Sequence, residues 1–381
     1  MNSNNIKLMK HLNIRIILVL FVTITSVKVS SKVVIENEDG IGIEYNLSDE
    51  GASVINISSI PSSIATGECF ELYIPESVTY NGNIYSVYGI SLAGNLNYQA
   101  YYISKLYIPQ SIKQISGLFR ERLKTLIFEN ISKIFYGGSS IFYSCKLENV
   151  IVKHINDPDD YYDRFGSVYT NYQTDIFTQN TYKHANLFVP VGTWADFAYT
   201  ENRIPGWSNF IHIREMAMDV EGLSESKAYA LIDTKNFNYY VYDVVNNHIT
   251  SRGSHSNFDE SSPYNSWQIV KTDDGFALYN IGAKRYATLT TNGELDLSIV
   301  PTILPMENAS NGITMGNSQF GFVLNENVNI DQSVTSIGKK VIYENSIAKY
   351  YTLDGRNSDV PHKGLNIVRM RNGETKKILV K

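Results

Sequence analysis

The sequence predicts a mainly β protein that consists of a repeat solenoid, an all-β domain and a small C-terminal β module. Three observations predict this class. Short apolar runs recur between residues 105 and 153 roughly every 20 to 24 residues, as in proteins built from stacked repeats. β-branched and aromatic residues are frequent, with 27 tyrosines in the chain, and these residue types favour strands. Asp-Gly and Asn-Gly pairs separate many of the apolar runs, which is typical of hairpin turns.

Residues 1–31 have the organisation of a secretory signal peptide. Lys7, Lys10 and Arg15 precede an apolar run at 16–24, and small or polar residues follow it. The run is too short to span a bilayer, and no later segment of the sequence is a candidate for spanning one. The alternative is a buried first strand of the fold. The signal-peptide interpretation predicts a protein that is secreted or displayed on the cell surface.

Length, charge and cysteine content limit the possible classes. A chain of 381 residues is long enough for two or three domains. The net charge of −5 and the absence of a basic cluster argue against nucleic acid as a partner. Cys69 and Cys145 could form a disulfide in an exported protein. Because Cys145 lies within an apolar repeat, we favour a buried, unpaired thiol there.

Residues 32–68 are predicted to form a β cap that covers the first repeat, since the ends of a solenoid need a covering layer. Three short strands are expected, at residues 33–35, 41–45 and 52–57. Asp39-Gly40 and Glu50-Gly51 lie between them as turn signals, and Asn81-Gly82 predicts a further hairpin.

Residues 69–216 carry the repeats. The segments that define the pattern are Leu72-Tyr73-Ile74-Pro75, Leu106-Tyr107-Ile108-Pro109, the run 144–152, and Leu187-Phe188-Val189-Pro190. These segments resemble BspA-type leucine-rich repeats. The resemblance implies a leucine-rich-repeat solenoid with short strands along one side, in an exported protein that mediates adhesion by binding a host or bacterial surface protein. Residues 156–186 interrupt the spacing, and we expect them to form an inserted recognition loop.

Residues 223–330 lose the repeat spacing and predict a separate all-β domain. The expected strands are 228–232, 239–242, 267–270, 276–280 and 286–289. Their order is similar to that of ricin-type β-trefoil lectins, although a β-sandwich would produce the same pattern. The resemblance implies the alternative function, which is glycan binding by this domain.

Residues 333–381 predict a small β module with period-two alternation and turns at Asp354-Gly355 and Asn372-Gly373. The segment resembles the C-terminal modules of exported Bacteroidetes proteins, including the type IX secretion sorting domain. The alternative is a terminal β module that does not act as a secretion signal.

The sequence contains no catalytic or metal-binding spacing, so we expect a non-enzymatic protein without a cofactor. The candidate binding residues are Tyr101, Tyr102, Tyr161, Tyr162 and Trp194. An acidic segment offers weak candidates for calcium, although a solvated acidic turn is the simpler interpretation; its carboxylates are Asp157, Asp159, Asp160 and Asp163. Trp207 and Trp267 are predicted to be core residues.

Overall fold

A computed structural model describes most of the chain and confirms that it is mainly β. The described residues are 31–64, 67–92, 99–117, 119–130, 135–136, 141–142, 144–155, 177–198, 207–253, 258–272, 275–332, 334, 347–353, 355–358, 360–370 and 373–380. The chain divides into two compact units, of which the first comprises Met1–Val150 and Ile155–Ala185 and the second Ile151–His154 and Asn186–Lys381. The predicted signal peptide lies outside the described residues, apart from Ser31.

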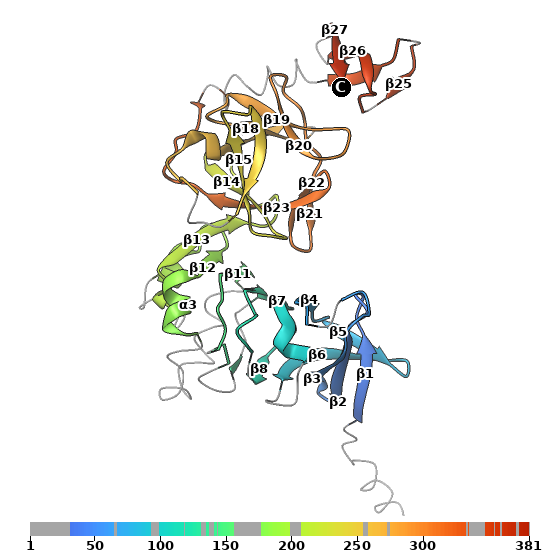
Figure 1. Cartoon of the computed structure of the whole chain (residues 1–381), viewed down its shortest axis with the longest axis vertical. Helices are drawn as coiled ribbons and strands as arrows, with labels where there is room; N and C mark the ends of the chain where they lie inside the picture. The colour runs from blue at the N-terminus through green and yellow to red at the C-terminus, as the bar shows by residue number, and fades with distance from the viewer. Residues whose placement is uncertain are drawn as a thin grey trace, which may run out of the picture. The chain divides into compact units, whose positions relative to one another are not determined.

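The first sheet of the first unit begins antiparallel and continues parallel (Figure 1). Its antiparallel strands are β1 (Ser31–Glu36), β2 (Gly42–Ser48) and β3 (Gly51–Ser59). Its parallel strands, which follow β3, are β6 (Asn83–Leu92), β8 (Gln114–Gly117) and β10 (Phe135–Tyr136). The hairpin between β5 (Ser77–Tyr80) and β6 turns at Asn81 and Gly82, both with positive φ, as the sequence predicts.

The second sheet of the first unit is parallel and is formed by β4 (Phe70–Tyr73), β7 (Ile103–Ile108) and β9 (Thr125–Asn130). Leu72, Leu106 and Leu126 are aligned across the three strands and are fully buried, so one face of this sheet is core. Between β4 and β10 the chain passes repeatedly from one sheet to the other. The predicted apolar runs therefore supply the second sheet, while the turns between them supply the first.

The C-terminal part of the segment 156–186, which we expected to be a loop, contributes to the core. Helix α3 (Gln179–His184) begins after Thr178, whose hydroxyl accepts a hydrogen bond from the Thr181 N–H. Phe177 is buried and stacks on Phe142 with ring centroids 5.4 Å apart. Residues 156–176 lie outside the described part. The expectation of an exposed loop is therefore wrong for residues from Phe177 onward.

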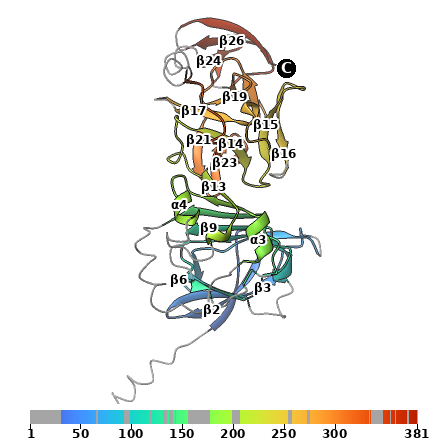
Figure 2. The ribbon, with the colours of Figure 1, turned by 90° about the vertical axis from the view of Figure 1, so that its left-hand side faces the viewer.

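The second unit contains a long mixed sheet (Figure 2). Its strands, in spatial order, are β20 (Leu295–Ser298), β19 (Arg285–Leu289), β18 (Gly275–Asn280), β17 (Trp267–Thr272), β14 (Ala228–Asp233), β23 (Ser318–Leu324), β13 (His212–Ala217), β12 (Asn186–Val189) and β11 (Asn149–His154). Two hairpins extend it, formed by β15 (Tyr239–Asp243) with β16 (His248–Arg252), and by β21 (Met306–Ala309) with β22 (Gly312–Met315). Trp267, Tyr229 and Phe322 lie in its core, which confirms the prediction for Trp267.

Short helices and a separate sheet complete the second unit. Trp207 in η4 (Trp207–Asn209) is buried beside Phe197 of α4 (Trp194–Ala198) and beside Phe210, as predicted for a core residue. The C-terminal residues form a small antiparallel sheet of β24 (Ile347–Tyr351), β25 (Asn357–Ser358), β26 (Gly364–Met370) and β27 (Thr375–Val380). Among the residues described, no helix has the length and apolar character needed to cross a membrane.

Candidate binding surface

The candidate site lies at the N-terminal edge of the second sheet in the first unit. Because β4, β7 and β9 are parallel, the residues that precede them meet at the same edge. Cys69 precedes β4, Tyr101 and Tyr102 precede β7, and Arg122 lies a few residues before β9. Side chains that are far apart in the sequence are thus brought together by strand pairing.

Arg122 is the centre of this cluster. Its guanidinium lies 4.7 Å from the ring centroid of Tyr102 and 5.2 Å from that of Tyr101. Nη1 donates to the Gly67 carbonyl at 3.1 Å and to the Cys69 sulfur at 3.6 Å. The contact with Cys69, followed by that with Tyr101, raises the pKa of Arg122. Arg122 is therefore a permanent charge held over two aromatic faces, an arrangement that fixes its orientation.

Glu121 supplies the opposite charge beside Arg122. The Tyr101 hydroxyl donates to its Oε1 at 3.0 Å, and Lys146 Nζ lies 3.6 Å from its Oε2. The hydrogen bond from Tyr101 and the nearby Lys146 lower the pKa of the Glu121 carboxyl. Exposed ion pairs of this kind add little stability. Glu121 and Lys146 are therefore suited to exchange their contacts for those of a partner.

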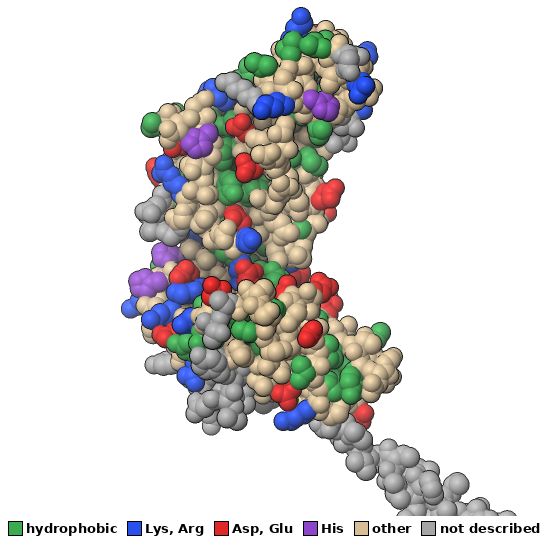
Figure 3. All heavy atoms as spheres, turned by 45° about the vertical axis from the view of Figure 1, so that its right-hand side comes forward, with side chains coloured by type: hydrophobic (Ala, Val, Ile, Leu, Met, Phe, Trp, Pro, Cys, Tyr) green, Lys and Arg blue, Asp and Glu red, His purple; other side chains and the backbone are tan. Residues whose placement is uncertain are grey.

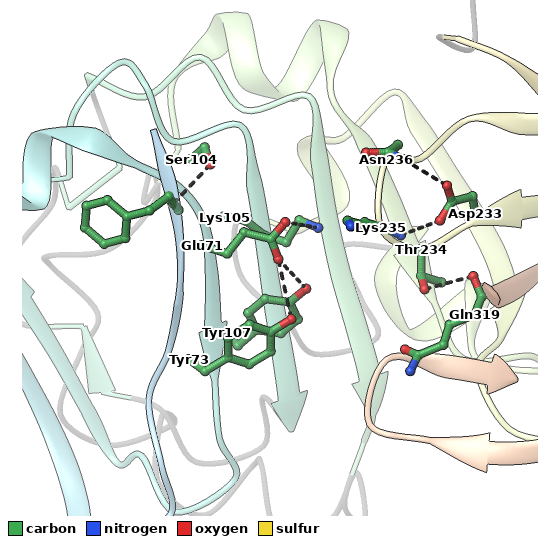
Figure 4. A network of polar contacts seen from close by, with 11 residues as sticks. Glu71, Tyr73, Ser104, Lys105, Tyr107, Asp233, Thr234, Lys235, Asn236 and Gln319 are labelled. Carbon is green, nitrogen blue, oxygen red and sulfur yellow. Dashed lines mark hydrogen bonds and ion pairs between the residues drawn. The ribbon is translucent and has the colours of Figure 1, made fainter. Parts of the chain in front are cut away.

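A second group of polar contacts lies on the non-core face of the same sheet (Figure 4). The rings of Tyr73 and Tyr107 stack with centroids 3.7 Å apart, and both hydroxyls donate to Glu71 Oε2, at 3.4 and 3.3 Å. Lys105, whose side chain is 7% exposed, places Nζ 3.2 Å from Glu71 Oε1. Desolvation by burial, with Tyr73 and Glu71 as further causes, raises the pKa of Tyr107 well above its ordinary range. These contacts hold β4 and β7 together.

The other polar network in Figure 4 belongs to the second unit and has a structural role. Asp233 accepts hydrogen bonds from the Lys235 N–H at 2.7 Å and from Asn236 Nδ2 at 3.1 Å. An Asp that satisfies the donors of the next residues is the usual device for closing a turn. This network shapes the connection between β14 and β15.

The five predicted binding residues lie in different places. Tyr101 and Tyr102 belong to the Arg122 cluster, but Tyr102 is buried, and its ring packs against the guanidinium. Trp194 is 41% exposed at the start of α4 in the second unit, and its backbone N–H donates to Glu215 Oε1 at 2.9 Å. Tyr161 and Tyr162 lie outside the described residues, as do Asp157, Asp159, Asp160 and Asp163. Elsewhere, in the part of the chain that the structure describes, no group of three or more His, Cys, Asp or Glu side chains could hold a metal ion.

The charged members of the cluster were missed by the sequence analysis. Arg120, Glu121 and Arg122 directly precede the apolar run that becomes β9. When the repeats are aligned, the residues that precede each apolar run are expected to lie at the same edge of the sheet. This alignment could have placed Arg122 beside Tyr101.

The surface carries charges of both signs. On the face drawn in Figure 3, acidic and basic side chains of the described residues are interspersed. Comparisons of the chain with protein-family models, with curated proteins and with solved structures found no match.

Proposed function

We propose that this protein is an exported, non-enzymatic repeat protein of the BspA-type leucine-rich-repeat class that binds a host or bacterial surface protein. The binding surface is the Arg122 cluster, which consists of Cys69, Tyr101, Tyr102, Glu121 and Arg122. The C-terminal β module acts as a secretion signal.

The alternation of the chain between the parallel strands of two sheets supports the repeat architecture. Leu106 and Leu126 are paired in register, so consecutive apolar runs occupy equivalent positions in neighbouring strands. The sheet formed by β3, β6, β8 and β10 receives the intervening segments. Each segment buries its apolar side only when its neighbours stack on it, which is the physical basis of a solenoid.

The single observation that carries the binding proposal is the placement of Arg122 over Tyr101 and Tyr102. Arginine and tyrosine dominate the binding energy of many protein interfaces. Here they are fixed in position before a partner arrives, which reduces the entropy lost on association. Glu121 and Lys146 beside them provide charges of both signs at the rim.

Surface plasmon resonance tests this function with the full secreted chain flowed over immobilised fibronectin, laminin and collagen. The double variant Tyr101→Ala/Arg122→Ala should lose at least about tenfold in affinity, which corresponds to about 1.4 kcal/mol. The matched control is Gln110→Ala/Lys113→Ala, since both residues are exposed in the same unit.

The control variant should bind like the parent. If both double variants bind like the parent, the Arg122 cluster is not the binding surface. If the parent binds neither these proteins nor whole host or bacterial cells, the adhesion function itself is wrong.

A further inference from the structure

A group of aromatic and polar side chains converges on the surface of the second unit, and we propose that it binds a carboxylated sugar residue of a glycan. This site is formed by Tyr242, Asn247, Tyr264 and Arg285. It does not depend on the function proposed for the first unit.

Three separate segments supply the site. Tyr242 and Asn247 belong to the β15–β16 hairpin, Tyr264 to η6 (Pro263–Asn265), and Arg285 to the start of β19. The rings of Tyr242 and Tyr264 lie with centroids 5.9 Å apart and planes inclined by 33°. The Tyr242 hydroxyl donates to Asn247 Oδ1 at 2.7 Å, and Arg285 Nη1 donates to the same oxygen at 3.0 Å.

Tyr264 is held rigidly although 37% of its surface is exposed. Its carbonyl accepts a hydrogen bond from Nδ2 of the buried Asn280 at 3.0 Å. A Cβ atom at Gly282 would lie 2.5 Å from the Tyr264 nitrogen and 2.6 Å from its Cδ1, so only glycine permits this approach. An exposed ring with a fixed backbone is a platform on which the C–H face of a sugar can stack without further ordering.

Arg285 supplies a positive charge that no carboxylate of the described residues neutralises. Its hydrogen-bond partner is the neutral amide of Asn247, and among the described residues no carboxylate forms an ion pair with it. The carboxylate of the same hairpin, Asp243, accepts instead from the N–H groups of Val245 and Asn246 and from the Asn246 side chain. Of the five N–H donors of a guanidinium, most therefore remain available to a ligand.

The chemistry of these groups selects the ligand class. A guanidinium matches a planar carboxylate with two parallel hydrogen bonds. The Asn247 amide nitrogen, which makes no hydrogen bond to the described protein, can donate to a sugar hydroxyl. A pyranose with a carboxylate substituent, which is a uronic acid or a sialic acid, meets both requirements while its ring stacks on Tyr264.

Ligand-observed NMR titration of the full chain with trigalacturonate, 3′-sialyllactose, sulfated lactose and lactose tests the proposal. At least one carboxylated probe should bind, about tenfold more tightly than lactose, and its binding should weaken with added NaCl. Binding of trigalacturonate would indicate a uronic acid, and binding of 3′-sialyllactose would indicate a sialic acid. Arg285→Gln should reduce the affinity for this probe to that for lactose. Arg285→Lys keeps the positive charge but loses the paired N–H donors of the guanidinium, and its affinity for the probe should lie between those of the parent and Arg285→Gln.

Arg252→Gln is the matched control, because Arg252 is an exposed arginine at the opposite end of the same hairpin. This variant should bind like the parent, and all three variants should melt at the parent temperature. The proposal is overturned if no carboxylated probe binds, if lactose or sulfated lactose binds equally well, or if Arg285→Gln has no larger effect than Arg252→Gln.

Discussion

Lys105 and Glu71 lie opposite each other on β7 and β4, and Lys105 Nζ is 3.2 Å from Glu71 Oε1. The lysine side chain is 7% exposed, whereas the glutamate is 36% exposed. A cation in this position depends on its counter-charge, because burying an unpaired charge is costly. The stacked rings of Tyr73 and Tyr107 beside the pair restrict the glutamate further.

Glu71→Gln should therefore destabilise the first unit by about 1–3 kcal/mol, measured by urea unfolding. The double variant Glu71→Gln/Lys105→Met should cost less than the sum of the two single changes, since it removes both partners. Glu148→Gln breaks the exposed pair with Lys124 and serves as the control, with an expected cost of about 0–1 kcal/mol. Equal costs for the two glutamates would contradict the assignment.

The two thiols differ in accessibility. Cys69 is exposed, Cys145 is 3% exposed, and both are unpaired, which confirms the prediction for Cys145. Burial raises the pKa of the Cys145 thiol to about 12, so the reactive thiolate is scarce at neutral pH. A thiol reagent should label one cysteine rapidly in the native protein and both in denaturant. Cys69→Ser should abolish the rapid phase, and native labelling of both thiols at similar rates would show that Cys145 is accessible.

Alkaline pH should destabilise the protein. Burial raises the pKa of Tyr239 to about 12 from an ordinary value of 10.0. The folded state therefore holds this proton at pH values where the unfolded state has lost it. The stabilisation is complete below pH 10.0 and is lost as pH rises toward about 12. Tyr239→Phe should make the free energy of unfolding less dependent on pH in this window, and an unchanged slope would refute the assignment.

Trp207 and Trp194 provide a matched pair of tryptophans in the second unit. Trp207→Ala removes a buried ring that contacts Phe197 and Phe210, and should cost about 3–5 kcal/mol. Trp194→Ala alters a ring that is 41% exposed, and should change stability by less than about 0.5 kcal/mol. Thermal unfolding followed by circular dichroism measures both. A larger loss for Trp194→Ala would reverse the two roles.

Phe177→Ala should likewise destabilise the first unit by about 3–5 kcal/mol, because its ring is buried against Phe142. Lys183→Ala, an exposed change in the following helix, is the control and should be nearly neutral. An unaffected melting temperature for Phe177→Ala would restore the interpretation of this segment as a loop.

The positions of most strands could be predicted from the sequence. Apolar runs such as Leu106-Tyr107-Ile108 and turn pairs such as Asn81-Gly82 act locally, because side-chain alternation and positive φ are decided within a few residues. Strand β16 (His248–Arg252) lacks such a local pattern and was not predicted. It has few apolar residues, and its pairing with β15 supplies the backbone hydrogen bonds that define it.

The candidate sites were decided by tertiary structure. Tyr101 and Arg122 meet because β7 and β9 pair in parallel register. Tyr264 is held beside the β18–β19 turn because the buried Asn280 bonds both to its carbonyl and to the Ala283 N–H. The sequence determined that these residues lie in or near turns beside strands. Which of them share a surface depends on pairing between distant segments, and that register is set by burial of the whole apolar face.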